Sequence, residues 1–158
     1  MPEAAKTSAR QRFLDFLARK DLRLTGQRRA IMETVFGTEQ HFTAEELLAW
    51  SRQRDKSVSR ATVYRTLPLL AESGLVREMD FGKGHVVYDP NYAERPRHNH
   101  IVCLDCGRIV EFESDKIEEL EEEVSQRLGF TVKAHRLQIT ATCDEFRRLG
   151  TCSRAGRP

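Results

Sequence analysis

Four cysteines have the types and spacing that bind a metal ion. Cys103 and Cys106 form a Cys-x2-Cys pair followed directly by Gly107, and this spacing lets two thiolates on a tight turn bind one tetrahedral Zn²⁺. The glycine supplies the backbone freedom that such a turn needs. Two more cysteines, Cys143 and Cys152, lie downstream, and the four together predict one structural zinc site. Two buried thiols or a redox pair at positions 103 and 106 are the alternatives, and the loose Cys-x8-Cys spacing gives Cys152 the least support as a ligand.

A second group of ligand-type residues lies in the same stretch. His98 and His100 are two residues apart, so their side chains point to the same face if this segment is a β-strand. Glu111 lies in Arg-Ile-Val-Glu-Phe, which predicts the second strand of a hairpin whose turn holds the first two cysteines. Imidazole and carboxylate ligands suit iron or manganese as well as zinc. The stretch therefore predicts ligands for two metal sites.

Length and composition bound the kind of protein. The chain has 158 residues, with 39% hydrophobic and 32% charged residues, which predicts a soluble globular protein of one domain or two small ones. We find no apolar run of the ~20 residues that a membrane span needs and no signal peptide, so we expect a cytoplasmic protein. Residues 1–90 carry 15 Lys and Arg against 12 Asp and Glu, whereas residues 91–158 carry 11 against 12. The N-terminal half therefore has a small excess of positive charge, which mildly favours the binding of polyanions.

The elements that position these residues follow from caps and periodicity. Residues 1–8 are expected to be a disordered leader, and a first helix is predicted over 9–20. A second helix is predicted after the N-cap Thr25, and a third after the capping box that begins at Thr43. A fourth helix is predicted from Ser59 to Gly74, with a kink at Pro68. Residues 75–89, with glycines at 82 and 84, predict a β-hairpin. Helices that end in such a hairpin form a winged helix-turn-helix.

The C-terminal part predicts a small α/β unit. It contains the metal-binding hairpin over 98–112, an amphipathic helix over 115–128 and a strand over 131–143. The expected fold class is therefore α+β. Its divisions are a winged-helix DNA-binding domain at 1–89, a hinge or linker at 90–97 and a metal-binding domain at 98–158.

Together these motifs resemble the ferric uptake regulator (Fur) family of metal-dependent repressors. The matching segments, in chain order, are Leu24-Thr-x-Gln-Arg28, Ala61-Thr-Val-Tyr-Arg-Thr-Leu67, His98-x-His100, Cys103-x2-Cys106-Gly107 and Ile109-Val-Glu-Phe112. Their order and spacing cover nearly the whole chain after residue 10, and in combination they are highly specific. The resemblance implies a homodimer with N-terminal winged helices, a C-terminal α/β dimerisation domain, a structural zinc held by four cysteines and a regulatory divalent-metal site.

The resemblance also implies which residues bind the regulatory metal. They would be His41, Asp89, His98, His100 and Glu111. A metal ion bound by this set would tie the two halves together, and it favours one interdomain angle only by binding that arrangement better than others. Because two recognition helices of a dimer must match the spacing of two half-sites, the angle controls DNA affinity. For His41 and Asp89 the alternative is a loop histidine and a strand-end acid without a metal.

Some family members have an additional metal site, whose positions here correspond to Arg97, Asn99, Glu118 and His135. A guanidinium is not a metal ligand, and an Asn amide is a weaker one than an Asp carboxylate. We therefore expect at most a depleted site with Glu118 and His135 as its ligands. A histidine that faces the core is the alternative at position 135.

The DNA contacts are predicted on and around the fourth helix. Tyr64 and Arg65 are expected on its exposed side, where Tyr64 would contact thymine methyl groups of an A·T-rich, palindromic operator of the kind this family uses. Phosphate contacts are expected from Arg60, Thr62, Lys56, Arg19 and Arg28. Ordinary surface solubility is the alternative for each of these basic residues.

Three classes of function fit these residues to different degrees. A metal-sensing repressor explains both halves of the chain. A zinc hydrolase that uses His98, His100 and a Glu is disfavoured because the chain has no His-Glu-x-x-His helix, and a structural zinc-ribbon adaptor leaves the winged helix unexplained. Glu111, where the peroxide-sensing branch of the family tends to have Asp, favours an Fe(II) sensor that controls iron-homeostasis genes. A zinc-responsive or a manganese- and peroxide-responsive regulator is the alternative.

Overall fold

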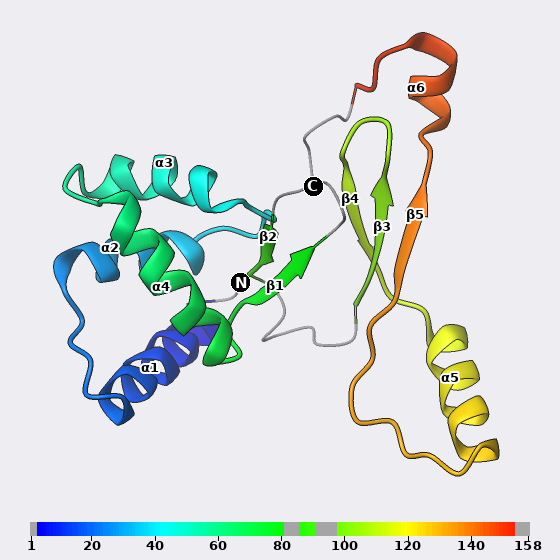
Figure 1. Ribbon diagram of the computed structural model, residues 1–158, viewed down its shortest axis with the longest axis horizontal. Helices are drawn as coiled ribbons and strands as arrows, with labels where there is room; N and C mark the ends of the chain where they lie inside the picture. Colours follow the sequence, from blue (N-terminus) through cyan, green and yellow to red (C-terminus); the bar gives the residue numbers. More distant parts are fainter. Residues whose placement is uncertain (1–2, 81–85, 91–97, 154–158) are drawn as a thin grey trace. The chain divides into compact units, whose positions relative to one another are not determined.

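The computed structural model describes residues 3–80, 86–90 and 98–153, and the predicted hairpin loop and most of the predicted linker lie outside these ranges. The chain divides into two compact units, Met1–Pro96 and Arg97–Pro158. Within the described residues, no helix has the length and apolar character to cross a membrane. In chain order the elements are α1 (Glu3–Arg19), α2 (Gly26–Val35), α3 (Ala44–Arg54), α4 (Arg60–Glu72), β1 (Arg77–Asp80), β2 (Val86–Asp89), β3 (Asn99–Cys103), β4 (Ile109–Phe112), α5 (Asp115–Arg127), β5 (Gln138–Ala141) and α6 (Asp144–Leu149) (Figure 1).

Three helix starts in the N-terminal unit are set by local hydrogen bonds. The side chains of Thr25 and Ser59 each accept a hydrogen bond from the amide three residues later. Thr43 and Glu46 form a reciprocal capping box at the start of α3. These bonds satisfy amides that have no partner inside a helix, and the predicted starts of α2, α3 and α4 are confirmed.

The first helix is longer than the sequence pattern predicted. It begins at Glu3 rather than near residue 9, so the segment expected to be a disordered leader is largely helical. The prediction relied on apolar periodicity, and residues 3–8 carry none of the large apolar side chains that produce it. Alanine, glutamate and lysine in this segment are nevertheless strong helix formers.

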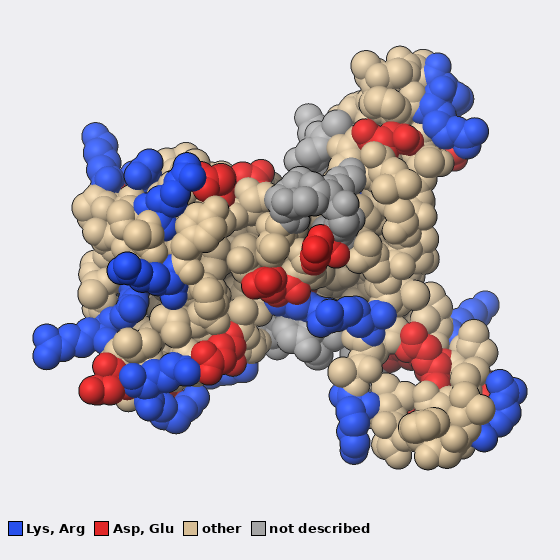
Figure 2. All heavy atoms as spheres, in the orientation of Figure 1, with Lys and Arg blue, Asp and Glu red and all other residues tan. Residues whose placement is uncertain are grey.

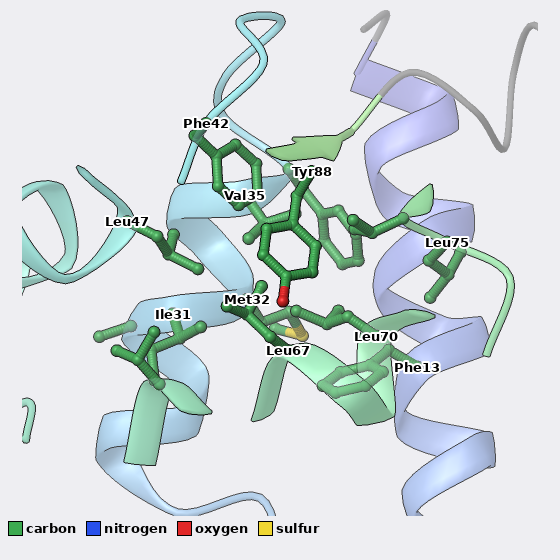
Figure 3. Packing of buried hydrophobic residues seen from close by; sticks show 14 of the residues in the cluster. Phe13, Ile31, Met32, Val35, Phe42, Leu47, Leu67, Leu70, Leu75 and Tyr88 are labelled. Carbon is green, nitrogen blue, oxygen red and sulfur yellow. The ribbon is translucent and has the colours of Figure 1, made fainter. Parts of the chain in front are cut away.

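The core of the N-terminal unit joins all four helices to the hairpin. Figure 3 shows side chains from α1, α2 and α4 meeting around Tyr88 of β2. Buried residues of this core include Phe13, Leu17, Ile31, Val35, Leu47, Leu67, Leu70 and Leu75, each at most 1% exposed. β1 and β2 pair antiparallel, and Phe42 forms an isolated bridge with Tyr88. Four helices closed by a two-stranded wing confirm the winged helix-turn-helix.

The C-terminal unit is built on a three-stranded sheet of order β4-β3-β5. β3 pairs antiparallel with β4 and parallel with β5, so the predicted metal-binding hairpin is present. β5 covers Gln138–Ala141, whereas a strand over 131–143 was predicted. Within the described residues, the pairing of β5 with β3 begins at Gln138, opposite His100. The alternating pattern of residues 131–137 was therefore insufficient to predict a longer strand.

The C-terminal unit has almost no hydrophobic core of its own. Among the described residues, the buried apolar side chains of this unit are Val102 and Cys103, and α5 buries none of its residues. Large apolar side chains remain exposed on α5 and after it, including Leu120 (58%), Leu128 (65%) and Phe130 (70%). A unit of this size needs a further source of stability, such as a metal ion or a second subunit.

Candidate metal centres and nucleic-acid interface

The four cysteines converge at one end of the C-terminal sheet. One sulfur atom from each of Cys103, Cys106 and Cys143 lies within 4.8 Å of the others. The sulfur of Cys152 lies 3.7 Å from that of Cys143. None of the four forms a disulfide. They come from the end of β3, the β3–β4 turn and the two sides of α6.

The turn between β3 and β4 positions the first pair of thiols. The Gly107 amide donates to the Cys103 carbonyl at 3.1 Å, and the Cys103 amide donates to the Arg108 carbonyl at 2.9 Å. Gly107 has φ 75°, a left-handed conformation in which a residue with a Cβ is strained. The Cys106 amide points at the Cys103 sulfur, 3.5 Å away. This is the tight Cys-x2-Cys-Gly turn that the spacing predicted.

A short helix accounts for the loose spacing of the second pair. Cys143 is the residue before α6, a six-residue helix that the sequence pattern did not predict. The helix ends at Leu149, the φ of 67° at the following Gly150 lets the chain reverse, and Cys152 follows two residues later. The eight intervening residues therefore bring the sulfur of Cys152 back to that of Cys143.

The electrostatics of this cluster favour a bound cation. Burial, together with the neighbouring Cys103 and Cys152 thiols, raises the pKa of the Cys106 thiol to about 11, although a backbone hydrogen bond from Arg108 acts in the opposite direction. For Cys103, burial also raises the pKa, but hydrogen bonds from the amide and side chain of Cys106 and from the Asp105 amide outweigh it, so the net pKa of Cys103 is lowered. Four adjacent sulfurs cannot all ionise without a positive charge between them. A tetrahedral Zn²⁺ fits this donor set.

The histidine and glutamate group lies on the adjacent part of the same sheet. His100 and Glu111 are direct partners across the β3–β4 ladder, and His98 is the residue before β3. One ligand atom from each of the three lies within 4.8 Å of the others, and the two imidazole rings are 4.7 Å apart. Both histidines are buried, at 2% and 3% exposure. Nitrogen and oxygen donors of this kind fit Fe²⁺, Mn²⁺ or Zn²⁺.

The two other predicted regulatory ligands lie beside each other in the N-terminal unit. The Phe42 amide donates to the Tyr88 carbonyl at 3.1 Å, and the Tyr88 amide donates to the Phe42 carbonyl at 2.8 Å. In an antiparallel pair the flanking residues also face each other, so His41 lies opposite Asp89. Asp89 is fully buried. The joining of this pair to the histidines of the C-terminal unit stays a prediction.

Two of the four positions that correspond to the additional site, Asn99 and His135, lie side by side. The two ring nitrogens of His135 are hydrogen-bonded to Asn99 and to Glu121, and Glu121 is not one of the four positions. Within the described ranges, no cluster of three or more His, Cys, Asp or Glu ligand atoms includes Glu118 or His135. Arg97 lies outside the described residues. A metal site here stays a prediction, and two protein groups already hold the imidazole.

The fourth helix presents the expected DNA-reading side chains to solvent. Tyr64 is 52% exposed, and Arg65 and Arg60 are exposed as well. Figure 2 shows Lys and Arg side chains spread over the N-terminal unit with Asp and Glu among them. Lys56 and Arg19 are among the exposed basic residues.

Three of the predicted phosphate contacts, Thr62, Arg28 and Arg60, are engaged within the protein, Arg60 by an ion pair with Glu45 at 2.9 Å. The Thr62 hydroxyl donates to the Gln27 side-chain oxygen at 2.6 Å, and the Ser59 amide donates to the same oxygen at 3.2 Å. The Arg28 guanidinium donates to the Arg23 carbonyl at 2.8 Å. Gln27 was missed as a residue that positions the recognition helix, although it belongs to the Leu24-Thr-x-Gln-Arg28 motif that signalled the family.

Comparisons with known proteins agree with this architecture. A profile described as the ferric uptake regulator family matches residues 19–140. A ferric uptake regulation protein of Brucella abortus is 40% identical over 123 residues, which cover 78% of this chain and 86% of that protein. The peroxide operon regulator of Bacillus subtilis is 34% identical over 132 residues, which cover 84% of this chain and 89% of that protein. The structure of the Helicobacter pylori ferric uptake regulator, described as having three functional metal binding sites, superposes with a TM-score of 0.81 at 27% identity and covers 90% of this chain and 93% of its own.

Proposed function

This chain belongs to the ferric uptake regulator family, and from that premise we propose that it is a repressor that senses Fe(II) and controls iron-homeostasis genes. Proteins of this family are transcriptional regulators rather than enzymes. The observation that carries the proposal is the buried group of His98, His100 and Glu111, which is separate from the thiols and has donors suited to reversible binding of Fe²⁺.

The chain would have two metal sites with different roles, one structural and one regulatory. Cys103, Cys106, Cys143 and Cys152 would hold a structural Zn²⁺ that does not exchange as metal levels change, because four thiolates bind zinc tightly. His98, His100 and Glu111 would form the regulatory site, completed by His41 and Asp89. In this arrangement residues 1–89 bind DNA, residues 90–97 are the hinge, and residues 98–158 bind metal and form the dimer.

The regulatory metal would act by linking the two units. Its ligands from residues 98–111 lie in one unit, and His41 and Asp89 lie in the other. A bound divalent cation supplies the charge that neutralises the carboxylates and the coordination bonds that favour one arrangement of the units. Such linkage is usually worth about 1–3 kcal/mol, and operator DNA must then tighten metal binding by the same factor.

The partner surfaces follow from exposure. The apolar side chains that α5 and the following residues leave exposed would be buried against a second copy of the chain, giving a homodimer. A symmetric dimer presents two recognition helices and therefore matches a palindromic site in double-stranded DNA. The A·T-rich composition of that operator and a cytoplasmic location are part of the proposal.

The identity of the sensed metal is the point to test, because both an iron regulator and a peroxide regulator are similar to this chain. Operator binding is titrated with Fe(II), Mn(II) and Zn(II) under anaerobic conditions, using duplexes selected from a random pool. We expect Fe(II) to increase operator affinity at the lowest free concentration. Tighter activation by Zn(II), or activation by Mn(II) with loss of binding on peroxide treatment, would instead assign one of the two alternatives.

A matched pair of variants tests the site itself. Glu111→Gln removes one ligand charge while preserving the shape of β4, and we expect it to lose the metal response but to keep zinc and the dimer. Glu113→Gln makes the same change two residues away at an exposed position and should respond as the parent does. Equal metal responses in the two variants would exclude Glu111 as a ligand.

A further inference from the structure

One carboxylate on α3 holds two side chains of the recognition helix. The Tyr64 hydroxyl donates a hydrogen bond to Glu45 Oε1 at 3.1 Å. The Arg60 guanidinium lies 2.9 Å from Glu45 Oε2. Positions 60 and 64 are one turn apart on α4 and share a face of the helix. Tyr64, predicted to contact bases, and Arg60, predicted to contact phosphates, are therefore bound to the same acid in the free protein.

The contribution of this cluster to folding stability is small. The side chains of Glu45 and Arg60 are 50% and 68% exposed, and exposed ion pairs contribute little to stability. The start of α3 is capped by Thr43 and Glu46, so the cap does not require Glu45. The hydrogen bond to Glu45 raises the pKa of Tyr64 above its ordinary value, and the hydroxyl of a tyrosine is protonated and a donor at neutral pH even without this shift. An acid facing two DNA-reading residues calls for a role in binding.

We propose that Glu45 is a positioning residue that sets the specificity of DNA binding, because its carboxylate orients Tyr64 and keeps Arg60 from the phosphates of unrelated DNA. The inference rests on the proposed DNA-binding function. Any duplex must displace Glu45 from Arg60 and approach its negative charge. Only on the operator does the carboxylate also hold Tyr64 in place for its base contacts, and this charge-assisted hydrogen bond offsets part of the cost. The acid therefore weakens sequence-independent binding more than operator binding.

The substitution Glu45→Gln separates charge from shape. The amide oxygen of Gln still accepts a hydrogen bond from Tyr64, whereas the negative charge opposite Arg60 is lost. Fluorescence anisotropy compares an operator duplex, selected from a random pool by the parent loaded with Mn(II), with a scrambled duplex of equal composition at several salt concentrations. We expect affinity for the scrambled duplex to rise by about two- to fivefold, the range of an exposed ion pair. Operator affinity should rise less.

A second readout distinguishes this role from a purely structural one. If Arg60 gains a phosphate contact, the slope of log affinity against log salt on the scrambled duplex becomes steeper by about 0.9. A change in folding alone would lower the affinity for both duplexes. The folded protein that remains would show the same slope of log affinity against log salt as the parent. Zinc content and circular dichroism of the variant are measured alongside.

Glu72→Gln is the matched control. Its side chain is 56% exposed and pairs with Lys20 at 2.6 Å, so it undergoes the same change of charge at a similar site. It lies at the other end of α4, about 18 Å from Arg60 along the helix axis, and the Debye length is only about 8 Å at physiological salt. We expect the ratio of operator to scrambled affinity to fall in Glu45→Gln and to stay at the parent value in Glu72→Gln.

Three results would overturn the proposal. An unchanged affinity ratio and salt slope in Glu45→Gln, with the parent binding its operator, would refute the role of Glu45 alone. An equal fall of the ratio in Glu72→Gln would show a general effect of net charge. A parent that binds no duplex when loaded with Fe(II), Mn(II) or Zn(II) would refute the DNA-binding function and this inference with it.

Discussion

Replacing Cys103 with Ser should unfold the C-terminal unit rather than weaken it slightly. Cys103 ends β3, pairs in register with Ala141 of β5, and lies within 4.8 Å of the Cys106 and Cys143 sulfurs. A zinc ion bound there would tie two strands of the sheet, the β3–β4 turn and the segment that carries α6. A serine hydroxyl does not replace the thiolate, so we expect the zinc to be lost.

The expected magnitude follows from how little else holds this unit together. Its described residues include only Val102 and Cys103 as buried apolar side chains, whereas the N-terminal unit buries apolar residues from all four of its helices and from the wing. Structural Zn²⁺ contributes about 10–16 kcal/mol in small zinc-dependent peptides. Whole domains are stable by only about 5–15 kcal/mol. The free energy lost with the zinc should therefore exceed the free energy of unfolding that the rest of the C-terminal unit provides.

Amide hydrogen exchange measures the stability of each unit separately. The informative amides are those of His100 and Leu104, which donate to the Leu137 and Ala141 carbonyls and join β3 to the β5 segment. In Cys103→Ser we expect these amides to lose their protection from exchange. We expect the amides of α2 and α4 to keep theirs, because the N-terminal core contains none of the four cysteines that would bind zinc. Zinc content and dimerisation are measured on the same samples.

The control is Thr140→Ser, a conservative change at an exposed position of β5 that pairs with Val102. It should keep zinc, dimer and exchange protection. If Cys103→Ser is free of zinc and still protects the β3 and β5 amides as the parent does, the zinc ion does not stabilise this sheet and the reasoning fails.

Three further predictions concern the metal switch and DNA binding. His41→Ala should keep zinc and the dimer but reduce the metal-stimulated gain in operator affinity by about 5- to 150-fold, the usual range of such coupling; a full metal response in titrations with Fe(II) or Mn(II) would contradict the bridging mechanism. Tyr64→Ala should weaken operator binding by about 5- to 100-fold with metal content unchanged, and equal operator affinity would show that α4 does not read the major groove through this residue. Lys56→Ala should weaken binding to operator and scrambled duplexes alike and flatten the salt dependence, whereas a selective loss on the operator would mean that Lys56 contacts bases.

Features that depend on neighbouring residues were predictable from the sequence. The caps at Thr25, Thr43 and Ser59 and the turn at Gly107 each depend on groups a few residues apart, and the pairing of His100 with Glu111 depends on one short hairpin. Their geometry is limited by backbone sterics and short hydrogen bonds, which a sequence motif records directly. The same holds for the identity of the ligand types, since thiolates, imidazoles and carboxylates carry their metal preference with them.

Features that depend on packing between distant segments were decided only by the tertiary structure. The approach of Cys152 to Cys143 required α6 to form, and the parallel pairing of β5 with β3 limited the strand to four residues. Gln27 meets the start of α4, and Glu45 meets Tyr64, only because α2 and α3 pack against α4 at particular angles. Those angles follow from the whole buried core, so no local pattern encodes them.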